Sequence, residues 1–218
     1  MILYGSSLSP FVRKTLAYAA EKAIELELQP TGNAPGQPSD EFLQASPLRK
    51  MPALRDGDYT LADSTAIIHY LEAKFPEPPL IPLEPKLKGK AMWFEEFADT
   101  VACAAVGKIF FNRVVAPRFL GRDGDNEAAA ACERDDLPPM LDYLEMVVPS
   151  DDGYVVGDRL TVADIAVASP FANFQHCDIT VDGDRYPLTV AYVDRILGRR
   201  SFSQYVERER ALLAKLAA

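Results

Sequence analysis

The residues best suited to chemistry lie in two short motifs in the first third of the chain. Met51-Pro52 opens a short apolar run, and Asp63-Ser64 follows where a helical pattern begins. If the bond before Pro52 is cis, the chain turns sharply and the backbone of Met51 faces outward, where it can pair with an extended peptide. The free N–H groups and positive dipole end of a helix suit a carboxylate. Together the motifs predict a receptor for a short anionic peptide.

Each motif also has a purely structural interpretation. Pro52 can simply begin a strand, because a residue without an N–H is tolerated at a strand start but not in its middle. Asp63 and Ser64 carry the side chains most common at helix N-caps. Taken singly, each motif leaves this interpretation open. Their order and spacing favour the binding site.

The elements that must position these motifs follow from apolar periodicity. Strands are predicted at 2–4, around 26–28, at 52–55 and at 59–61; helices at 10–23, 40–44 and 64–74; and a loop at 30–38. Ser9-Pro10 has the residue types of an N-cap and a first helical position. Asp56-Gly57 is a hairpin turn signal. The order β-α-β-(α)-β-β-α is that of a thioredoxin-like α/β domain.

Five prolines between Pro76 and Pro85 mark a stiff linker. We therefore expect domains at 1–78 and 86–218, joined by a proline-rich linker at 79–85. The second domain is predicted to be all-helical, with helices at 86–115, 126–148 (interrupted at Pro138-Pro139), 165–174, 188–198 and 202–216. Its first helix carries apolar residues at three- and four-residue steps, as an amphipathic helix does; these are Met92, Trp93, Phe97, Val101, Ala104 and Phe111. Thr161 and Asp164 have the spacing of a capping box.

Composition excludes several classes of function. The chain has 218 residues, 48% of them hydrophobic and 25% charged, which is typical of a soluble globular protein. A net charge of −9 disfavours nucleic acid or an anionic membrane as partner. No apolar run is long enough to predict a membrane span, and no signal peptide is expected. Three widely spaced cysteines and two histidines favour a reducing cytoplasm and predict no metal site.

Several stretches carry a family resemblance in the right order along the chain. They are Ser9-Pro10-Phe11-Val12-Arg13, Ser46-Pro47-Leu48-Arg49-Lys50-Met51-Pro52-Ala53-Leu54, Asp63-Ser64-Thr65-Ala66-Ile67, Tyr70-Leu71 and Gly157-Asp158-Arg159-Leu160-Thr161-Val162-Ala163-Asp164. With these the chain resembles the cytosolic glutathione transferases over essentially its whole length. The resemblance implies a thioredoxin-like N-terminal domain, an all-helical C-terminal domain, a homodimer, and glutathione as co-substrate.

The resemblance also implies a role for each residue of the two motifs. Glutathione is a tripeptide whose extended backbone would pair with Met51 beside Pro52. Its γ-glutamyl carboxylate would meet the hydroxyl and N–H of Ser64, and its amine would meet Asp63. Lys50 would meet the glycyl carboxylate as a point charge.

Transfer chemistry requires the glutathione thiol to ionise. A free thiol has a pKa near 8.5, and lowering it by about two units takes roughly 2.7 kcal/mol. A hydroxyl donor and the dipole of the helix that starts at Pro10 are sufficient for this. Ser9 is our predicted catalytic residue, with Ser6 and Ser7 as alternatives and a plain N-cap as its structural interpretation. No cysteine precedes Cys103, which disfavours thiol-transferase chemistry.

The second substrate is expected to be a small hydrophobic electrophile, held between the domains against the first helix of the C-terminal domain. Phe11, Trp93 and Phe97 are candidates for this pocket, although packing within a helical core explains such aromatic residues equally well. Conjugation, dehalogenation and peroxide reduction all remain open. So does a glutathione-binding regulatory or scaffold protein without turnover, because a fold does not determine a function.

Overall fold

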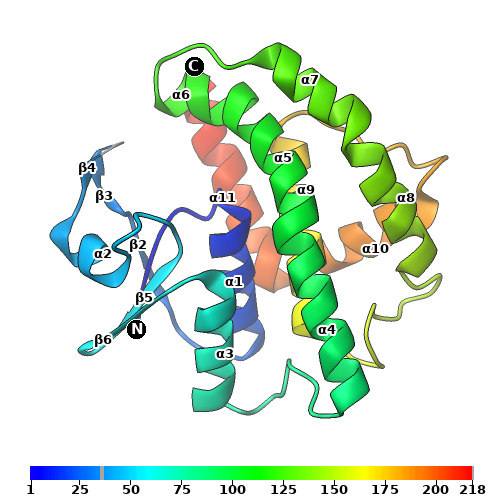
Figure 1. Ribbon diagram of the computed structural model, residues 1–218, viewed down its shortest axis with the longest axis horizontal. Coiled ribbons are helices and arrows are strands. Elements are labelled where there is room, and N and C mark those ends of the chain that lie inside the picture. Colours follow the sequence, from blue (N-terminus) through cyan, green and yellow to red (C-terminus); the bar gives the residue numbers. More distant parts are fainter. Residues whose placement is uncertain (35–36, 218) are drawn as a thin grey trace. The chain divides into compact units, whose positions relative to one another are not determined.

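The computed structural model of the protein describes residues 1–34 and 37–217. The chain divides into two compact units, Met1–Leu80 and Ile81–Ala218 (Figure 1). The first unit contains a small sheet with helices, and the second is helical. We describe each unit by itself.

The N-terminal unit has a four-stranded sheet with the strand order β2-β1-β5-β6. Its elements are β1 (Ile2–Tyr4), α1 (Pro10–Glu21), β2 (Glu27–Gln29), α2 (Asp40–Ala45), β5 (Ala53–Asp56), β6 (Tyr59–Ala62) and α3 (Ser64–Lys74). β1 pairs in parallel with β2 and antiparallel with β5, which forms a hairpin with β6. The thioredoxin-like prediction is therefore confirmed.

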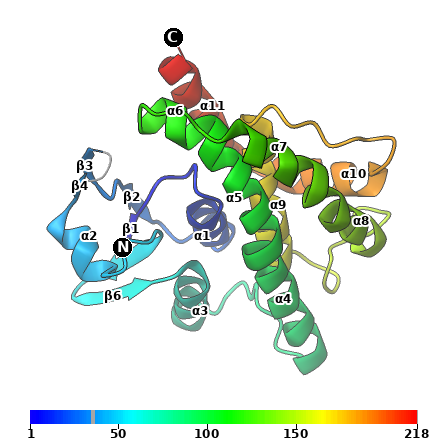
Figure 2. The ribbon, with the colours of Figure 1, turned by 45° about the horizontal axis from the view of Figure 1, so that its top comes forward.

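Strand alternation sends side chains to two faces of this sheet. Leu3 pairs with Leu54, and Tyr4 pairs with Ala53, so the two pairs point to opposite faces. Tyr4 and Ala53 form a buried cluster with Phe42 of α2. Figures 1 and 2 show α1 and α3 on the other face, where Leu3 and Leu54 are fully buried.

The predicted loop at 30–38 is partly wrong. Two short strands, β3 (Gly32–Ala34) and β4 (Gln37–Pro38), pair there as a separate antiparallel hairpin. Gly32 permits this pairing, because a Cβ atom at that position would lie 1.8 Å from the carbonyl oxygen of Gln37. The glycines and prolines that indicated a loop are compatible with a pair of very short strands outside the main sheet. Pro35 and Gly36 of this predicted loop lie outside the described residues.

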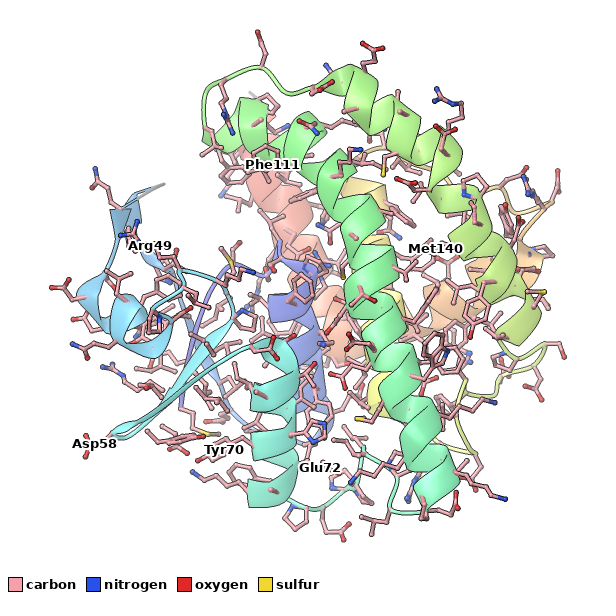
Figure 3. All side chains as sticks on the ribbon, viewed as in Figure 1. Arg49, Asp58, Tyr70, Glu72, Phe111 and Met140 are labelled. Atoms are coloured by element: carbon pink, nitrogen blue, oxygen red, sulfur yellow. The ribbon has the colours of Figure 1, made fainter. Side chains whose placement is uncertain are left out.

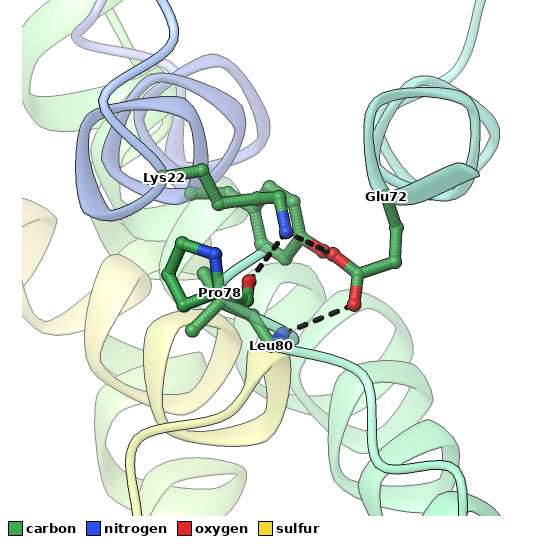
Figure 4. Close-up of polar contacts among 5 residues, drawn as sticks. Lys22, Glu72, Pro78 and Leu80 are labelled. Carbon is green, nitrogen blue, oxygen red and sulfur yellow. Dashed lines mark hydrogen bonds and ion pairs between the residues drawn. The ribbon is translucent and has the colours of Figure 1, made fainter. Parts of the chain in front are cut away.

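A buried ion pair closes the end of the N-terminal unit (Figure 4). The Lys22 side chain is fully buried, and its Nζ atom lies 2.6 Å from Oε2 of Glu72 and 2.5 Å from the carbonyl oxygen of Pro78. Glu72 also accepts a hydrogen bond from the hydroxyl of Tyr18 and, through Oε1, one from the N–H of Leu80. These contacts fasten the segment that leaves the unit to both α1 and α3.

The helical unit begins with one continuous helix from Pro85 to Phe119. It consists of α4 (Pro85–Phe97), the π-helical turn η1 (Ala98–Ala102), α5 (Cys103–Phe110), the π-helical turn η2 (Phe111–Val115) and α6 (Ala116–Phe119). The predicted long helix is confirmed and extends four residues further. By length and composition alone this helix could cross a membrane, with a mean hydropathy of 1.2 in its most apolar window. Core helices of soluble proteins meet the same criteria, and 44% of that window is buried here.

The apolar stripe predicted for this helix matches its buried face only in part, since Phe97 is buried but other members are not. Trp93, Val101 and Phe111 are exposed by 55%, 44% and 39% of their surface (Phe111 is labelled in Figure 3). The residues that are buried instead include Phe94, Ala98, Ala102, Val106, Ile109 and Val114. Apolar residues occupy more than one face of this helix. Each π-helical turn also rotates the residues that follow it away from the positions expected for a regular helix with 3.6 residues per turn.

Five further helices complete the described part of this unit, and among them α9 packs against α4, α5 and α10. They are α7 (Asn126–Asp135), α8 (Leu137–Val147), α9 (Val162–His176), α10 (Pro187–Leu197) and α11 (Arg200–Ala217). The predicted interruption at Pro138-Pro139 is confirmed, since both prolines lie in the first turn of α8. The capping box is also confirmed: the Thr161 N–H donates to Asp164 across 2.8 Å, and the Thr161 hydroxyl accepts from the N–H of Ala163. Burial raises the pKa of the Asp164 carboxyl.

Candidate functional site

The residues predicted to bind the anionic peptide line one cavity of about 580 Å³ in the N-terminal unit. Its lining consists of Phe11, Ser46, Pro47, Leu48, Lys50, Met51, Pro52, Ala62, Asp63 and Ser64. The loop before β5 and the start of α3 therefore meet, because β5 and β6 form the hairpin between them. All five predicted binding residues are in this lining, and Phe11 of α1 lies with them.

The Met51–Pro52 peptide bond is cis. Pro52 is buried directly before the first residue of β5, whereas Met51 is 38% exposed at the cavity. Within the described part of the chain, no backbone group hydrogen-bonds the N–H of Met51. An extended peptide in the cavity has this N–H available for strand-like pairing.

Asp63 is the N-cap of α3, so its structural interpretation is confirmed. Its Oδ1 atom accepts hydrogen bonds from the N–H groups of Thr65 at 2.9 Å and Ala66 at 3.1 Å. The backbone of Asp63 has a φ of +81°, a conformation that asparagine and aspartate tolerate better than most residues. Its second carboxylate oxygen has no hydrogen-bond partner among the described residues, so capping leaves a negative atom available at the cavity.

Ser64 is the first residue of α3 and is 2% exposed. The Asp63 side chain already takes the N–H groups of Thr65 and Ala66. The N–H and hydroxyl of Ser64 are therefore the donors that remain for a ligand at this helix start. One carboxylate can accept from both.

Ser46 is a functional candidate that sequence reasoning missed. Its hydroxyl donates to the carbonyl oxygen of Lys50 at 2.7 Å and accepts from the Lys50 N–H at 3.1 Å. It is 1% exposed and lines the cavity. The Ser46 side chain thus closes the loop that carries Lys50. Within this loop Arg49 (Figure 3) has a φ of +58°. A serine four residues before a predicted binding lysine is the signal that could have revealed this.

Ser9 does not line the cavity, although it lies two residues before Phe11, which does. It occupies the N-cap position of α1 with extended backbone angles, and its carbonyl accepts from the N–H of Arg13 at 2.9 Å. Its hydroxyl makes no capping hydrogen bond. By contrast, the Ser6 hydroxyl accepts from the N–H of Leu8. Of these two serines, Ser9 is the one whose hydroxyl has no hydrogen-bond partner among the described residues.

Trp93 and Phe97, predicted for the second-substrate pocket, belong to the helical unit. The indole N–H of Trp93 donates to the hydroxyl of Tyr143 in α8 at 2.9 Å, and the ring of Phe97 lies 5.0 Å from that of Tyr143. Phe97 is 6% exposed. Both residues thus contribute to an aromatic cluster between α4 and α8, and their contact with a substrate stays a prediction.

The cysteines do not form a reactive site. Cys103, Cys132 and Cys177 are buried, and none of them forms a disulfide bond. Burial raises the pKa of Cys132 to about 11 and that of Cys177 to about 12, because the thiolate is poorly solvated inside the protein. Across residues 1–34 and 37–217, no three His, Cys, Asp or Glu side chains are grouped so that they could hold a metal ion.

Comparison with known proteins gives matches to both units of the chain. Residues 3–79 match the family described as glutathione S-transferase, N-terminal domain, and residues 112–209 match glutathione S-transferase, C-terminal domain. The chain is 34% identical over 179 residues to glutathione S-transferase 4 of Zea mays, covering 80% of this chain and 76% of that protein. It is 29% identical over 211 residues to a glutathione S-transferase of Hyoscyamus muticus, covering 95% and 98% of the two chains. A Methylobacterium radiotolerans glutathione S-transferase, solved in complex with glutathione sulfonate, superposes with a TM-score of 0.75 at 28% identity, covering 94% and 93%.

Proposed function

The chain belongs to the glutathione S-transferase family, and from this premise we propose that its N-terminal cavity binds glutathione and activates the thiol for transfer to a small hydrophobic electrophile. One observation carries the proposal. Lys50, Met51, Asp63 and Ser64 converge on one cavity, and each offers the group that a different part of the tripeptide requires.

The fit is chemical as well as spatial. The N–H and hydroxyl of Ser64 would donate to the γ-glutamyl carboxylate at the positive end of the α3 dipole. The uncommitted oxygen of Asp63 would take the γ-glutamyl amine, and the exposed ammonium of Lys50 the glycyl carboxylate. The backbone N–H of Met51 would pair with the cysteinyl carbonyl.

Ser9 is our proposed thiol activator. Its hydroxyl is not used for capping, and it stands at the start of α1, where the helix dipole favours an anion. A hydroxyl donor and this dipole together would lower the thiol pKa by about two units. The thiolate would then form a C–S bond with the electrophilic carbon. In a substitution the leaving group would depart with the bonding electron pair, and in an addition the displaced electron pair would take up a proton from water.

The deciding experiment is a pH titration of bound glutathione, followed by the ultraviolet absorbance of the thiolate. The wild-type protein, Ser9→Ala and the matched controls Ser6→Ala and Ser7→Ala are compared. We expect the wild type and both controls to bind glutathione with a lowered thiol pKa, and Ser9→Ala to bind it with a thiol pKa much closer to the free value of about 8.5, since only the helix dipole remains.

The other outcomes are equally informative. A lowered pKa that survives Ser9→Ala would remove Ser9 from the proposal. Binding with an unchanged thiol pKa in the wild type would favour a scaffold role without turnover. No binding would overturn the assignment of the cavity. A panel of a chloroarene, a haloalkane and an organic hydroperoxide then separates conjugation, dehalogenation and peroxide reduction.

We also propose that the protein acts as a homodimer in the cytoplasm, as the family resemblance implies. The dimer is tested by light scattering of the purified chain at several concentrations. A constant mass of one chain would overturn it.

A further inference from the structure

The helical unit contains a second cavity, of about 230 Å³, that has no part in the proposed glutathione site. Its lining residues belong to α9, α10 and the segment that connects these two helices. Figure 2 shows the course of these elements. Its lining consists of Phe171, Phe174, Gln175, Ile179, Thr180, Val181, Val190, Val193 and Asp194. Most of this lining is apolar, and Phe171, Phe174 and Val193 are buried core residues. The floor of the cavity therefore suits an apolar group.

Asp194 is the one charged side chain in this lining. It is exposed, and its carboxylate has no hydrogen-bond or ion-pair partner among residues 1–34 and 37–217. The uncharged polar side chains of the lining are Gln175 and Thr180, and the amide oxygen of Gln175 is occupied by a hydrogen bond from Arg210 at 2.6 Å. An apolar cavity with one uncommitted carboxylate at its rim is complementary to an apolar cation.

Arg185, Arg195 and Arg210 each have a hydrogen-bond partner among the described residues. Arg185 pairs with Asp142, and Arg195 donates to the carbonyl oxygen of Gly153. Arg210 lines a neighbouring cavity of about 260 Å³, which shares Gln175 and Asp194 with the first. Three further carboxylates, those of Asp178, Asp182 and Asp184, lie in the connecting segment. The local charge thus favours a cationic ligand over a carboxylic acid.

We propose that this cavity binds a small arylalkylamine, with the aromatic ring on the apolar floor and the ammonium group at Asp194. The volume sets the size of the ligand. An apolar cavity of about 150 Å³ accepts benzene, so 230 Å³ leaves room for one ring and a short alkyl arm. The inference is independent of the proposed transferase chemistry, because it uses no residue of the N-terminal unit.

The test is methyl NMR of the full chain, titrated separately with phenethylamine, its neutral analogue phenethyl alcohol, and the acid hydrocinnamate. We expect phenethylamine to shift the methyl signals of Ile179, Val190 and Val193. It should bind about two- to five-fold more tightly than the alcohol, the range for an exposed ion pair. The difference should shrink at high salt.

Two variants make the test specific. Asp194→Asn should abolish the preference for the amine over the alcohol. Glu207→Gln, which makes the same charge change at the neighbouring cavity, should preserve it. Val190→Trp fills the cavity from a half-buried position and should abolish binding of both ligands while the thermal midpoint shows a folded protein.

Equal binding of amine and alcohol, tighter binding of hydrocinnamate, or shifts confined to other methyl groups would each overturn the proposal. Binding that persists in Val190→Trp would do the same. A glutathione titration of the same sample reports on the N-terminal cavity. A failure of the proposed glutathione site is therefore distinguished from a failure of the proposed amine site.

Discussion

Oδ1 of Asp63 lies 2.9 Å from the backbone nitrogen of Thr65, so the residue proposed to meet the ligand amine is also the N-cap of the helix that holds the ligand carboxylate. The two roles use different atoms of one carboxylate. Stability and binding at this position can therefore be separated by the choice of substitution.

Asp63→Asn should keep the cap and lose the charge, whereas Asp63→Ala should lose both. Asparagine caps helices as well as aspartate does, and loss of an N-cap costs about 1 kcal/mol. We expect Asp63→Asn to unfold close to the wild-type urea midpoint and Asp63→Ala to unfold earlier, with glutathione affinity reduced in both. Equal glutathione affinity of Asp63→Asn and wild type would contradict the proposed contact with the amine.

The Lys22–Glu72 pair should matter far more to stability than the Lys74–Asp56 pair. Lys22 is fully buried, whereas Lys74 keeps 39% of its side chain exposed. Glu72→Ala would leave the Lys22 ammonium buried without its counter-ion, which typically costs about 3–5 kcal/mol. Lys74→Ala, the matched control, breaks a solvent-screened pair and should change the unfolding free energy much less.

Urea unfolding of both variants measures this difference. Equal losses in Glu72→Ala and Lys74→Ala would show that water reaches Lys22 in the folded state. The Glu72→Gln variant refines the result, because its amide oxygen can still accept from Lys22 while the charge is gone.

Asp56 should give the stability a dependence on acid pH. Hydrogen bonds from Lys74 and Tyr70 hold the pKa of the Asp56 carboxyl below its ordinary value. The stabilisation is therefore complete above the unfolded pKa, near 3.9, and is lost as the pH falls through the lower folded value. The wild type should be more stable than Asp56→Asn at pH 5 to 7, and the two should converge towards pH 2.

Urea midpoints across this pH range provide the measurement. Asp58, at the tip of the same β5–β6 hairpin (Figure 3), supplies the control Asp58→Asn. If the difference between wild type and Asp56→Asn grew on acidification, the Asp56 pKa could not be lowered by folding.

The buried cysteines should resist thiol reagents until the protein unfolds. With a pKa of about 11, on the order of one Cys132 thiol in a thousand is ionised at pH 8, and burial blocks access besides. We expect negligible reaction with an aromatic disulfide reagent in buffer and three reactive thiols in urea. Rapid modification of one thiol in the native protein would show that its helix opens locally.

Local sequence signals determined much of the site. A proline before an apolar run, an Asp-Ser pair before a helical pattern, and a hairpin turn between them are each readable within a few residues. Backbone geometry converts such signals directly into structure, because strand starts, caps and turns depend on neighbouring residues. The thioredoxin-like order and the break at Pro138-Pro139 followed for the same reason.

Tertiary structure decided what depends on distant residues. Lys22 and Glu72 are fifty positions apart, and either alone reads as a surface charge; only the packing of α1 on α3 brings them together and buries Lys22. The buried face of the long helix could not be predicted from the sequence. Apolar residues occupy several faces of this helix, and its two π-helical turns change the angular position of the residues that follow them. The α9–α10 cavity is likewise a product of packing. The sequence by itself determines which chemical groups are present and how the backbone turns close to them. Which side chains are buried, and which charged groups lie in contact, depends on how separate helices and strands pack and exclude water.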